Sequence, residues 1–264
     1  MTALEPARVT AIALALVVGG LLVGCGEDSE PGSVGRDRQG QPVALALTED
    51  GRPDPAVLAE QQVLHRGNGQ EPQTLDPHLA DGVPAGNILR DLFEGLTAEA
   101  PDGRIVPGVA MRWNISRDGL TYTFYLRRDA RWSNGDPLLA EDFVWSFRRS
   151  ADPVTASNAA NMLLPIENAT AVISGQQSPE TLGVEALDQH TLQIRLTDPT
   201  PYFLGLLTHS ATYPVHRASV EQYGARFSRP GNLVSNGAYT LADWVVRSRI
   251  ELRRNENYWD NANT

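Results

Sequence analysis

The sequence predicts a mixed α/β fold in which short helices lie between antiparallel or meandering strands. Two patterns predict it. Apolar side chains recur at helical spacing in residues 87–96 and 140–150. Residues 121–126 and 191–196 instead alternate in the manner of half-buried strands. No internal repeat is visible, so the expected architecture is a globular body rather than a solenoid.

The chain begins with an apolar run that predicts an export signal. Residues 9–23 are apolar apart from Thr10 and two glycines, and Arg8 precedes them. A run of about fifteen residues is short for a bilayer-spanning helix, which needs about twenty, and is typical of a signal-peptide core. Residues 1–24 are therefore predicted to be a signal peptide.

The only cysteine, Cys25, follows this run directly. The stretch Leu22-Val23-Gly24-Cys25 resembles a bacterial lipobox, whose cysteine thiolate takes a diacylglyceryl group. Acyl chains of this kind hold a protein on a membrane. We expect Cys25 to be the lipid attachment site and the protein to lie in the periplasm or cell envelope. The alternatives are an ordinary secretory signal followed by a chance cysteine, and a cytosolic protein with a hydrophobic N-terminal helix.

A polar segment separates the cysteine from the body of the protein. Gly, Pro, Asp, Glu, Arg and Gln dominate residues 26–60, and such a composition buries too little apolar surface to offset its ordering entropy. Residues 25–61 are predicted to be a flexible tether. The net charge is -10 and no long basic run occurs, so nucleic acid is not an expected partner.

The elements of the body follow from local patterns. Helices are expected in residues 87–96, with Gly95 as the C-cap, in 140–150, and in 217–224, which ends on Gly224. Strands are expected in residues 121–126, 191–196 and 249–254, and Asp188-Gln189 is expected to turn a hairpin into the second of these. Asn134-Gly135 and Asn236-Gly237 are expected to be turns.

Catalytic and metal-binding signatures are missing from the sequence. It contains no HExxH, G-x-S-x-G, CxxC or Walker sequence. His209 and His216 do not share one helical face and have no thiolate or acidic partner in the pattern, so no metal site is expected. A local acidic group is expected to serve as helix caps and solvated helix faces: Asp76, Asp81, Asp91 and Glu94. Binding is therefore favoured over catalysis, and neither an enzymatic activity nor a cofactor is expected.

Three long blocks carry a family resemblance. Residues 64–96 (LHRGNGQEPQTLDPHLADGVPAGNILRDLFEGL), 119–149 (GLTYTFYLRRDARWSNGDPLLAEDFVWSFRR) and 233–261 (LVSNGAYTLADWVVRSRIELRRNENYWDN) resemble the extracellular solute-binding proteins, family 5, of oligopeptide ABC transporters. With shorter blocks between them, the match covers most of residues 62–262. The order and spacing of the blocks are more specific than any one of them.

The resemblance implies a bilobal fold of the periplasmic binding protein type, class II or cluster C. Residues 62–93 and 217–264 would form the discontinuous lobe I, and residues 94–216 a smaller inserted domain. The family continues with a second lobe, whereas this chain ends at Thr264. We therefore expect an incomplete N-terminal portion that binds peptides weakly or not at all.

The resemblance also implies ligand-binding residues. The family loop that corresponds to Asp81, Gly82 and Val83 contacts the ligand, and His209 aligns with a position that faces the side-chain pockets. Ala159 stands where a tyrosine often lies. Tyr258 and Trp259 could pack between lobes or contact the ligand, and packing is the favoured interpretation.

The expected function is that of a lipid-anchored solute-binding component of a peptide ABC transporter. It would capture oligopeptides as a monomer and deliver them to the permease subunits. Three alternatives stay open: a binding protein of the same family for nickel, haem or an oligosaccharide, a secreted hydrolase, and a structural or signalling lipoprotein. Leu139 departs from the family, which has a capping threonine there, and should weaken the helix start by about 1 kcal/mol.

Overall fold

The computed structural model describes residues 35–36, 42–43 and 62–264. β1 (Gly35–Arg36) pairs antiparallel with β2 (Pro42–Val43) in a first unit, which extends to His65. A second compact unit spans Arg66–Thr264. The predicted signal peptide, Cys25 and most of the predicted tether lie outside the described residues.

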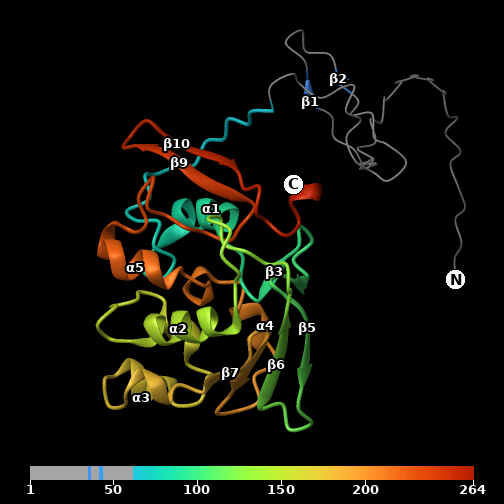
Figure 1. The fold of residues 1–264 in the computed structure, drawn as a ribbon, viewed down its shortest axis with the longest axis vertical. Helices are drawn as coiled ribbons and strands as arrows, with labels where there is room; N and C mark the ends of the chain where they lie inside the picture. The colour runs from blue at the N-terminus through green and yellow to red at the C-terminus, as the bar shows by residue number, and fades with distance from the viewer. Residues whose placement is uncertain (1–34, 37–41, 44–61) are drawn as a thin grey trace, which may run out of the picture. The chain divides into compact units, whose positions relative to one another are not determined.

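The second unit mixes helices, short 3-10 turns and strands, so the predicted mixed α/β class is confirmed (Figure 1). The α-helices are α1 (Gly82–Leu92), α2 (Ala140–Ala151), α3 (Ala169–Ile173), α4 (Phe203–Leu206) and α5 (Arg217–Tyr223). The 3-10 turns are η2 (Ala160–Leu163), η3 (Pro179–Thr181), η4 (Ser210–Thr212), η5 (Gly224–Arg226) and η6 (Asn261–Asn263). The strands are β3 (Thr97–Glu99), β4 (Ile105–Pro107), β5 (Ala110–Ile115), β6 (Thr121–Leu126), β7 (Val184–Asp188), β8 (Thr191–Arg195), β9 (Tyr239–Val245) and β10 (Arg249–Arg254).

A four-stranded antiparallel sheet forms one end of this unit. Its strand order is β5-β6-β8-β7, and Tyr122 of β6 lies between Ile115 of β5 and Ile194 of β8. Alternate residues of β6 are buried, as expected when one face of a sheet packs on a core. The hairpin predicted at Asp188 is confirmed: β7 and β8 pair across it, and the Asp188 carboxylate accepts the His190 N–H at 2.7 Å.

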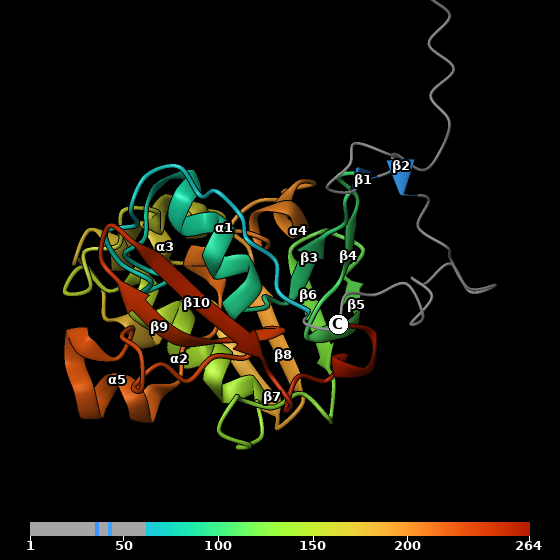
Figure 2. The same cartoon turned by 90° about the horizontal axis from the view of Figure 1, so that it is seen from above.

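A second layer lies at the opposite end, where α1 packs beneath the β9–β10 hairpin (Figures 1 and 2). The predicted strand 249–254 is confirmed as β10. The predicted helices 140–150 and 217–224 are confirmed as α2 and α5. α5 ends at Tyr223, and Gly224 is its C-cap with a φ of +54°. Among the described residues, none of the helices combines the length and apolarity needed to cross a membrane.

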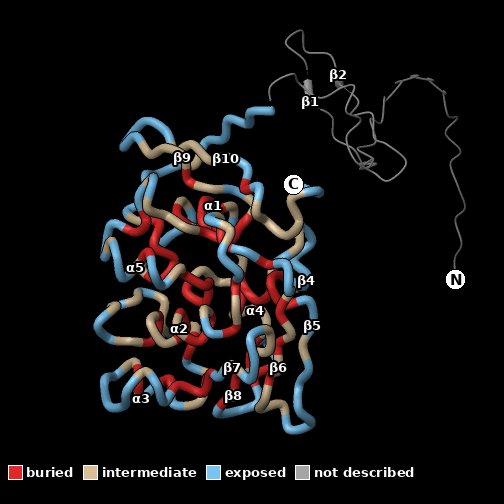
Figure 3. Tube along the Cα trace, viewed as in Figure 1, coloured by how far each residue is buried: buried red, intermediate tan, exposed pale blue. Residues whose placement is uncertain are grey.

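Buried residues lie along the inward-facing parts of the elements (Figure 3). Their apolar side chains form two clusters. The sheet cluster is built on one face of the four-stranded sheet and on α2; its largest buried members are Trp132, Phe124, Phe143, Phe147 and Phe203. The α1 cluster gathers around α1 and the hairpin; its members are Leu75, Ala80, Ala85, Ile88, Leu89, Leu92, Phe93, Tyr213, Val215, Phe227 and Leu241. The α1 cluster thus combines residues between 75 and 93 with residues between 213 and 241.

The helix predicted for residues 87–96 is wrong at both ends. α1 begins at Gly82 and ends at Leu92, where Phe93 turns extended and its N–H donates to Leu89 O. Gly95 is not a C-cap. A Cβ there would lie 2.8 Å from Leu207 O, so this glycine allows two chain segments to pack closely. Pro84 lies in the first turn of α1, where proline is well tolerated.

The two predicted Asn-Gly turns have different physical origins. Gly135 has a φ of +93° and its N–H donates to Trp132 O, as a tight turn requires. Gly237 lies instead against the end of α1. Its N–H donates to Leu92 O at 2.8 Å, and a Cβ would approach the Leu92 main chain to 2.5 Å.

The start of α2 is half-capped. Leu139 occupies the N-cap and offers no side-chain acceptor, as expected from the sequence. Asp142, three residues on, accepts the Leu139 N–H through Oδ2 at 2.8 Å. This supplies the reciprocal half of a capping box and leaves the other half unmade.

Substituting Leu139→Thr should complete this box. A threonine Oγ can accept a first-turn N–H, and the expected gain in the free energy of unfolding is about 0.5–1 kcal/mol. Valine has the shape of threonine without the hydroxyl oxygen. The difference in urea stability between Leu139→Thr and Leu139→Val therefore measures the contribution of the capping hydrogen bond. Equal stability of the two variants would show that the missing acceptor costs nothing.

Candidate functional site

A hollow of about 340 Å³ lies beside the start of α1. All four residues predicted to bind ligand line it: Asp81, Gly82, Val83 and His209. Ala159 lines it as well. The structure thus brings together residues up to 128 positions apart in the sequence, counted from Asp81 to His209. Their role in binding stays a prediction.

The Asp81–Val83 segment presents three different features to the hollow. Asp81 is the N-cap of α1, but its exposed carboxylate caps no N–H and pairs with no described residue. Gly82 has a φ of +79°, a conformation that glycine adopts without strain. Val83 is 75% exposed. An uncompensated anion and an exposed apolar side chain therefore lie side by side.

His209 is neutral and fixed in orientation. Its Nδ1 accepts the Ala211 N–H at 3.1 Å, so Nε2 carries the proton of the neutral ring. Burial lowers its pKa, the Arg90 guanidinium lowers it further, and Asp81 opposes both. At neutral pH the ring therefore supplies a hydrogen-bond donor and no charge.

Sequence reasoning missed the other lining residues, which carry no motif. They are Ala80, Gly86, Arg90, Thr208, Ser210 and Tyr213. Tyr213 is 6% exposed, and its hydroxyl donates to Thr208 O at 2.9 Å. Burial, its largest influence, raises the pKa of Tyr213 to about 12. Its position after a 3-10 turn gave no periodic signal.

A smaller hollow of about 150 Å³ adjoins the first, and Arg90, Thr208 and Tyr213 line both. Glu94 lines the smaller one and accepts Tyr258 O–H at 2.8 Å and Trp259 Nε1–H at 2.7 Å. Burial raises the pKa of Glu94, while these two donors and Arg127 oppose the shift. Tyr258 and Trp259 thus tie the end of the described chain to Glu94, as the packing interpretation expects.

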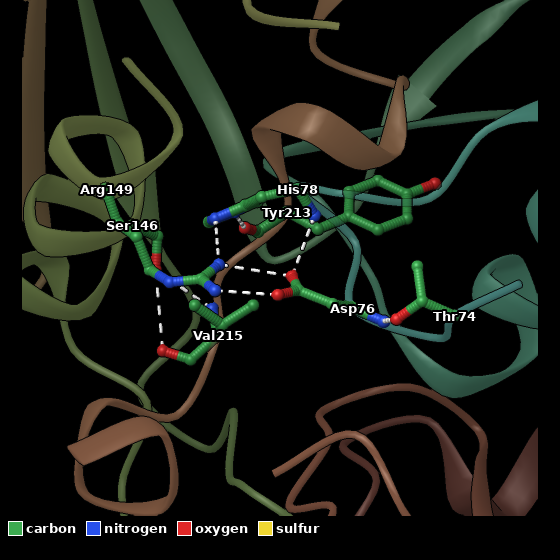
Figure 4. Close-up of polar contacts among 7 residues, drawn as sticks. All are labelled: Thr74, Asp76, His78, Ser146, Arg149, Tyr213 and Val215. Atoms are coloured by element: carbon green, nitrogen blue, oxygen red, sulfur yellow. Dashed lines mark hydrogen bonds and ion pairs between the residues drawn. The ribbon is translucent and has the colours of Figure 1, made fainter. Parts of the chain in front are cut away.

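A buried polar cluster contacts Tyr213, which lines the larger hollow (Figure 4). Arg149 of α2 donates to both oxygens of Asp76, at 2.6 and 3.1 Å, and to Nδ1 of His78 at 2.7 Å. Nε2 of His78 donates to Tyr213 O at 3.0 Å. Ser146, one turn before Arg149, accepts the Val215 N–H at 2.9 Å. We call Asp76, His78 and Arg149 the Asp76–Arg149 cluster; its link to Tyr213 is the hydrogen bond from His78.

The expectation that the acidic group serves as caps and solvated faces is wrong for Asp76 and Glu94. Asp76 is 3% exposed because Arg149 neutralises it, and Glu94 is held by two aromatic donors. It holds for Asp91, whose carboxylate meets Arg66 at 2.9 Å on the surface. The sequence does offer one signal for a buried carboxylate: Asp76 lies directly after the apolar Leu75 and two residues before His78.

Metal-binding geometry is not found within the described ranges, where no three His, Cys, Asp or Glu side chains converge. His216 instead caps α5. Its Nδ1 lies 2.8 Å from Ser219 Oγ and accepts the Ser219 N–H at 3.3 Å.

Comparison with known proteins identifies the family. Residues 104–264 match the family model of the bacterial extracellular solute-binding proteins, family 5 (middle region). The chain belongs to this family. The resemblance and the periplasmic binding protein type of fold seen in the sequence are thereby confirmed.

Curated relatives carry peptide-binding names. The chain is 50% identical over 222 residues to the periplasmic oligopeptide-binding protein OppA of Escherichia coli, covering 83% of this chain and 40% of that protein. It is 46% identical over 214 residues to the periplasmic murein peptide-binding protein MppA of Escherichia coli, covering 80% and 40%. The chain therefore spans about two fifths of the length of these family-5 relatives.

Solved structures of related binding proteins have the same fold as this chain over the part that it covers. The unliganded open form of MppA superimposes with a TM-score of 0.71 at 46% identity, over 74% of this chain and 38% of that one. OppA of Haemophilus influenzae in complex with the peptide RPPGFSPFR gives a TM-score of 0.72 at 43% identity, over 75% and 39%.

The Asp76–Arg149 cluster makes stability depend on pH. Burial, the largest cause, together with Arg149, lowers the pKa of His78 from 6.5 to about 4. The unfolded chain therefore takes up a proton first as the pH falls. Keeping the ring neutral contributes roughly 3 kcal/mol to the free energy of unfolding. This contribution is fully present above pH 6.5 and is lost as the pH falls towards 4.

Urea unfolding of the wild type and of His78→Gln at stepped pH measures this contribution. Glutamine does not titrate and keeps an amide donor for Tyr213 O, so the difference between the two proteins isolates the imidazole. The wild type should lose stability more steeply between pH 6.5 and 4. Parallel pH profiles would mean that His78 does not titrate in the folded state as described.

Proposed function

We propose that this family-5 chain is part of an extracytoplasmic solute-binding component of a peptide ABC transporter. It captures oligopeptides and passes them unchanged to the permease, and lipidation of Cys25 holds it on a membrane in the periplasm or cell envelope. The observation that carries this proposal is the hollow beside α1, which collects every residue expected to face the ligand.

The character of the hollow suits a peptide better than a single chemical group. Its lining is mostly small or apolar, with Ala80, Gly82, Gly86 and Ala159 leaving open space. Polar side chains complete the lining. A peptide main chain can form hydrogen bonds with such groups, and water can fill the remaining space. Peptide-binding names among the relatives support the same ligand class.

We further propose that residues 62–93 and 217–264 form lobe I and that residues 94–216 form the inserted domain. The two apolar clusters support this division, because the α1 cluster contains Leu75 and Leu92 together with Phe227 and Leu241. Tyr213 and Val215 also belong to the α1 cluster. The chain therefore returns from the inserted domain to lobe I a few residues before residue 217.

A binding protein of the same family for another solute is the second candidate. A relative 41% identical over 209 residues is named a probable deoxycholate-binding periplasmic protein of Escherichia coli. Family membership alone therefore does not select peptides, and the test must include other solutes.

Filling the hollow should abolish peptide binding without loss of stability. A Cβ on Gly86 would meet no atom within 4 Å, and replacing a helical glycine stabilises a helix by up to about 1 kcal/mol. In heteronuclear NMR titrations with millimolar trialanine, the wild type should shift amides in residues 80–86 and 208–213. Gly86→Leu should show no such shifts.

Ala218→Leu on the exposed face of α5 is the matched control and should bind like the wild type. Mass spectrometry of solutes that co-purify with the protein from cells gives an independent answer. Oligopeptides are the expected solutes; a metal, haem, a bile acid or an oligosaccharide in their place, with no shifts on peptide addition, would overturn the proposal.

A further inference from the structure

Three asparagines in this chain precede a glycine: Asn68, Asn134 and Asn236. In such a pair the glycine nitrogen can attack the asparagine side-chain carbonyl carbon, since no Cβ obstructs the approach. A C–N bond forms, ammonia leaves, and water opens the resulting cyclic imide to aspartate or isoaspartate. The reaction consumes only water. It requires a glycine N–H that is free and a carboxamide that can swing over it.

The Asn236 pair meets neither requirement. Asn236 is 2% exposed, and its carboxamide holds the main chain of Glu94 on both sides, through Nδ2 to the carbonyl at 2.8 Å and through Oδ1 to the N–H at 3.2 Å. The Gly237 N–H is already bonded to Leu92 O. Reaction here requires local unfolding of the α1 cluster.

The Asn134 pair is exposed but locked in a turn. The Gly135 N–H donates to Trp132 O at 2.8 Å, so the nucleophile is occupied. Asp136 holds the Asn134 carboxamide at both ends. Nδ2 of Asn134 donates to Oδ2 of Asp136 at 2.7 Å, and Oδ1 of Asn134 accepts the Asp136 N–H at 3.1 Å. Reaction requires this turn to open.

The Asn68 pair has a free nucleophile. The Gly69 N–H donates to no group in the described part of the chain, and Gly69 is exposed with a φ of +75°. Glycines on both sides of Asn68 have open space where a Cβ would lie. Arg66 is tied to Asp91 before this segment and Glu71 to Trp244 after it. Between them, the main chain of residues 67–70 makes no hydrogen bond to a described residue, and the two glycines leave it conformationally permissive.

We propose that Asn68 is a site of spontaneous deamidation in the folded protein. Only two side-chain hydrogen bonds restrain it, from Nδ2 to Pro84 O at 2.8 Å and from Asn87 Nδ2 to Oδ1 at 3.3 Å. Their loss exposes no apolar cluster. The order of reactivity is Asn68 first, Asn134 second and Asn236 last.

Deamidation at Asn68 changes the contact that steadies the start of α1. The amide donor facing Pro84 O becomes a carboxylate, so two acceptors meet where a hydrogen bond stood. The isoaspartate product also lengthens the main chain. Pro84 follows Val83 directly, so the change reaches the segment that lines the larger hollow. Any effect on ligand binding rests on the proposed function, whereas the reaction itself does not.

Peptide mapping by mass spectrometry after incubation of the full chain at mildly alkaline pH tests the proposal. Asn68 should convert at least about tenfold faster than Asn236, a difference equivalent to ~1.4 kcal/mol of opening free energy. In denaturant the three sites should convert at similar rates, because all three precede glycine. Asn68→Gln, which cannot form the five-membered imide readily, should remove the mass gain from that peptide alone.

Faster conversion at Asn134 than at Asn68, or equal rates at Asn68 and Asn236 in the folded protein, would overturn the assignment. Hydrogen exchange of Asn68→Asp tests the structural consequence. The Ala85 and Gly86 amides should exchange faster than in the wild type, whether or not the protein binds peptides. Unchanged exchange at these amides would overturn the proposed link to α1.

Discussion

The bidentate ion pair between Asp76 and Arg149 is the interaction on which the arrangement of this chain depends. It joins the loop before α1 to α2, and His78 extends it to the Tyr213 carbonyl (Figure 4). α2 buries Phe143, Val144 and Phe147 in the sheet cluster, so Arg149 extends from one apolar cluster to the other. A buried charge left without its partner costs about 3–5 kcal/mol, which makes any other placement of this loop unfavourable.

The position of the hollow follows from this constraint. Tyr213 accepts from His78 on one side and lines the hollow on the other. Asp81 and Gly82 follow the fixed loop by a few residues, and Asn68 steadies the next turn of α1 from outside. A buried polar network and the half-buried amide of Asn68 thus both position the site. Sites of this kind need support that keeps their geometry, and here a polar network acts beside the apolar packing of α1.

Much of this could be predicted from the sequence, because β6, β8, β10 and α2 have regular apolar periods and Gly224 marks the end of α5. The start of α1 could not, since Gly82 and Pro84 resemble a loop unless the left-handed φ and the tolerance of a first turn for proline are known. Asp76 and Glu94 were misjudged because a buried carboxylate differs from a solvated one only through partners 73 and 164 positions away, Arg149 and Tyr258. The residues of the hollow were found through the family resemblance. Arg90, Thr208 and Tyr213 have no periodic pattern, and only the folded chain brings them together.

Native-state hydrogen exchange in Arg149→Met tests most directly whether the ion pair couples the two apolar clusters. In the wild type, the slowest amides of α1 and of β6 should exchange through one shared opening. In Arg149→Met, the Leu89 and Leu92 amides should lose protection, while those of Phe124 and Leu126 retain most of theirs. Equal loss of protection in both elements, or no loss in either, would contradict the account, because the clusters would then be coupled by contacts other than Asp76–Arg149.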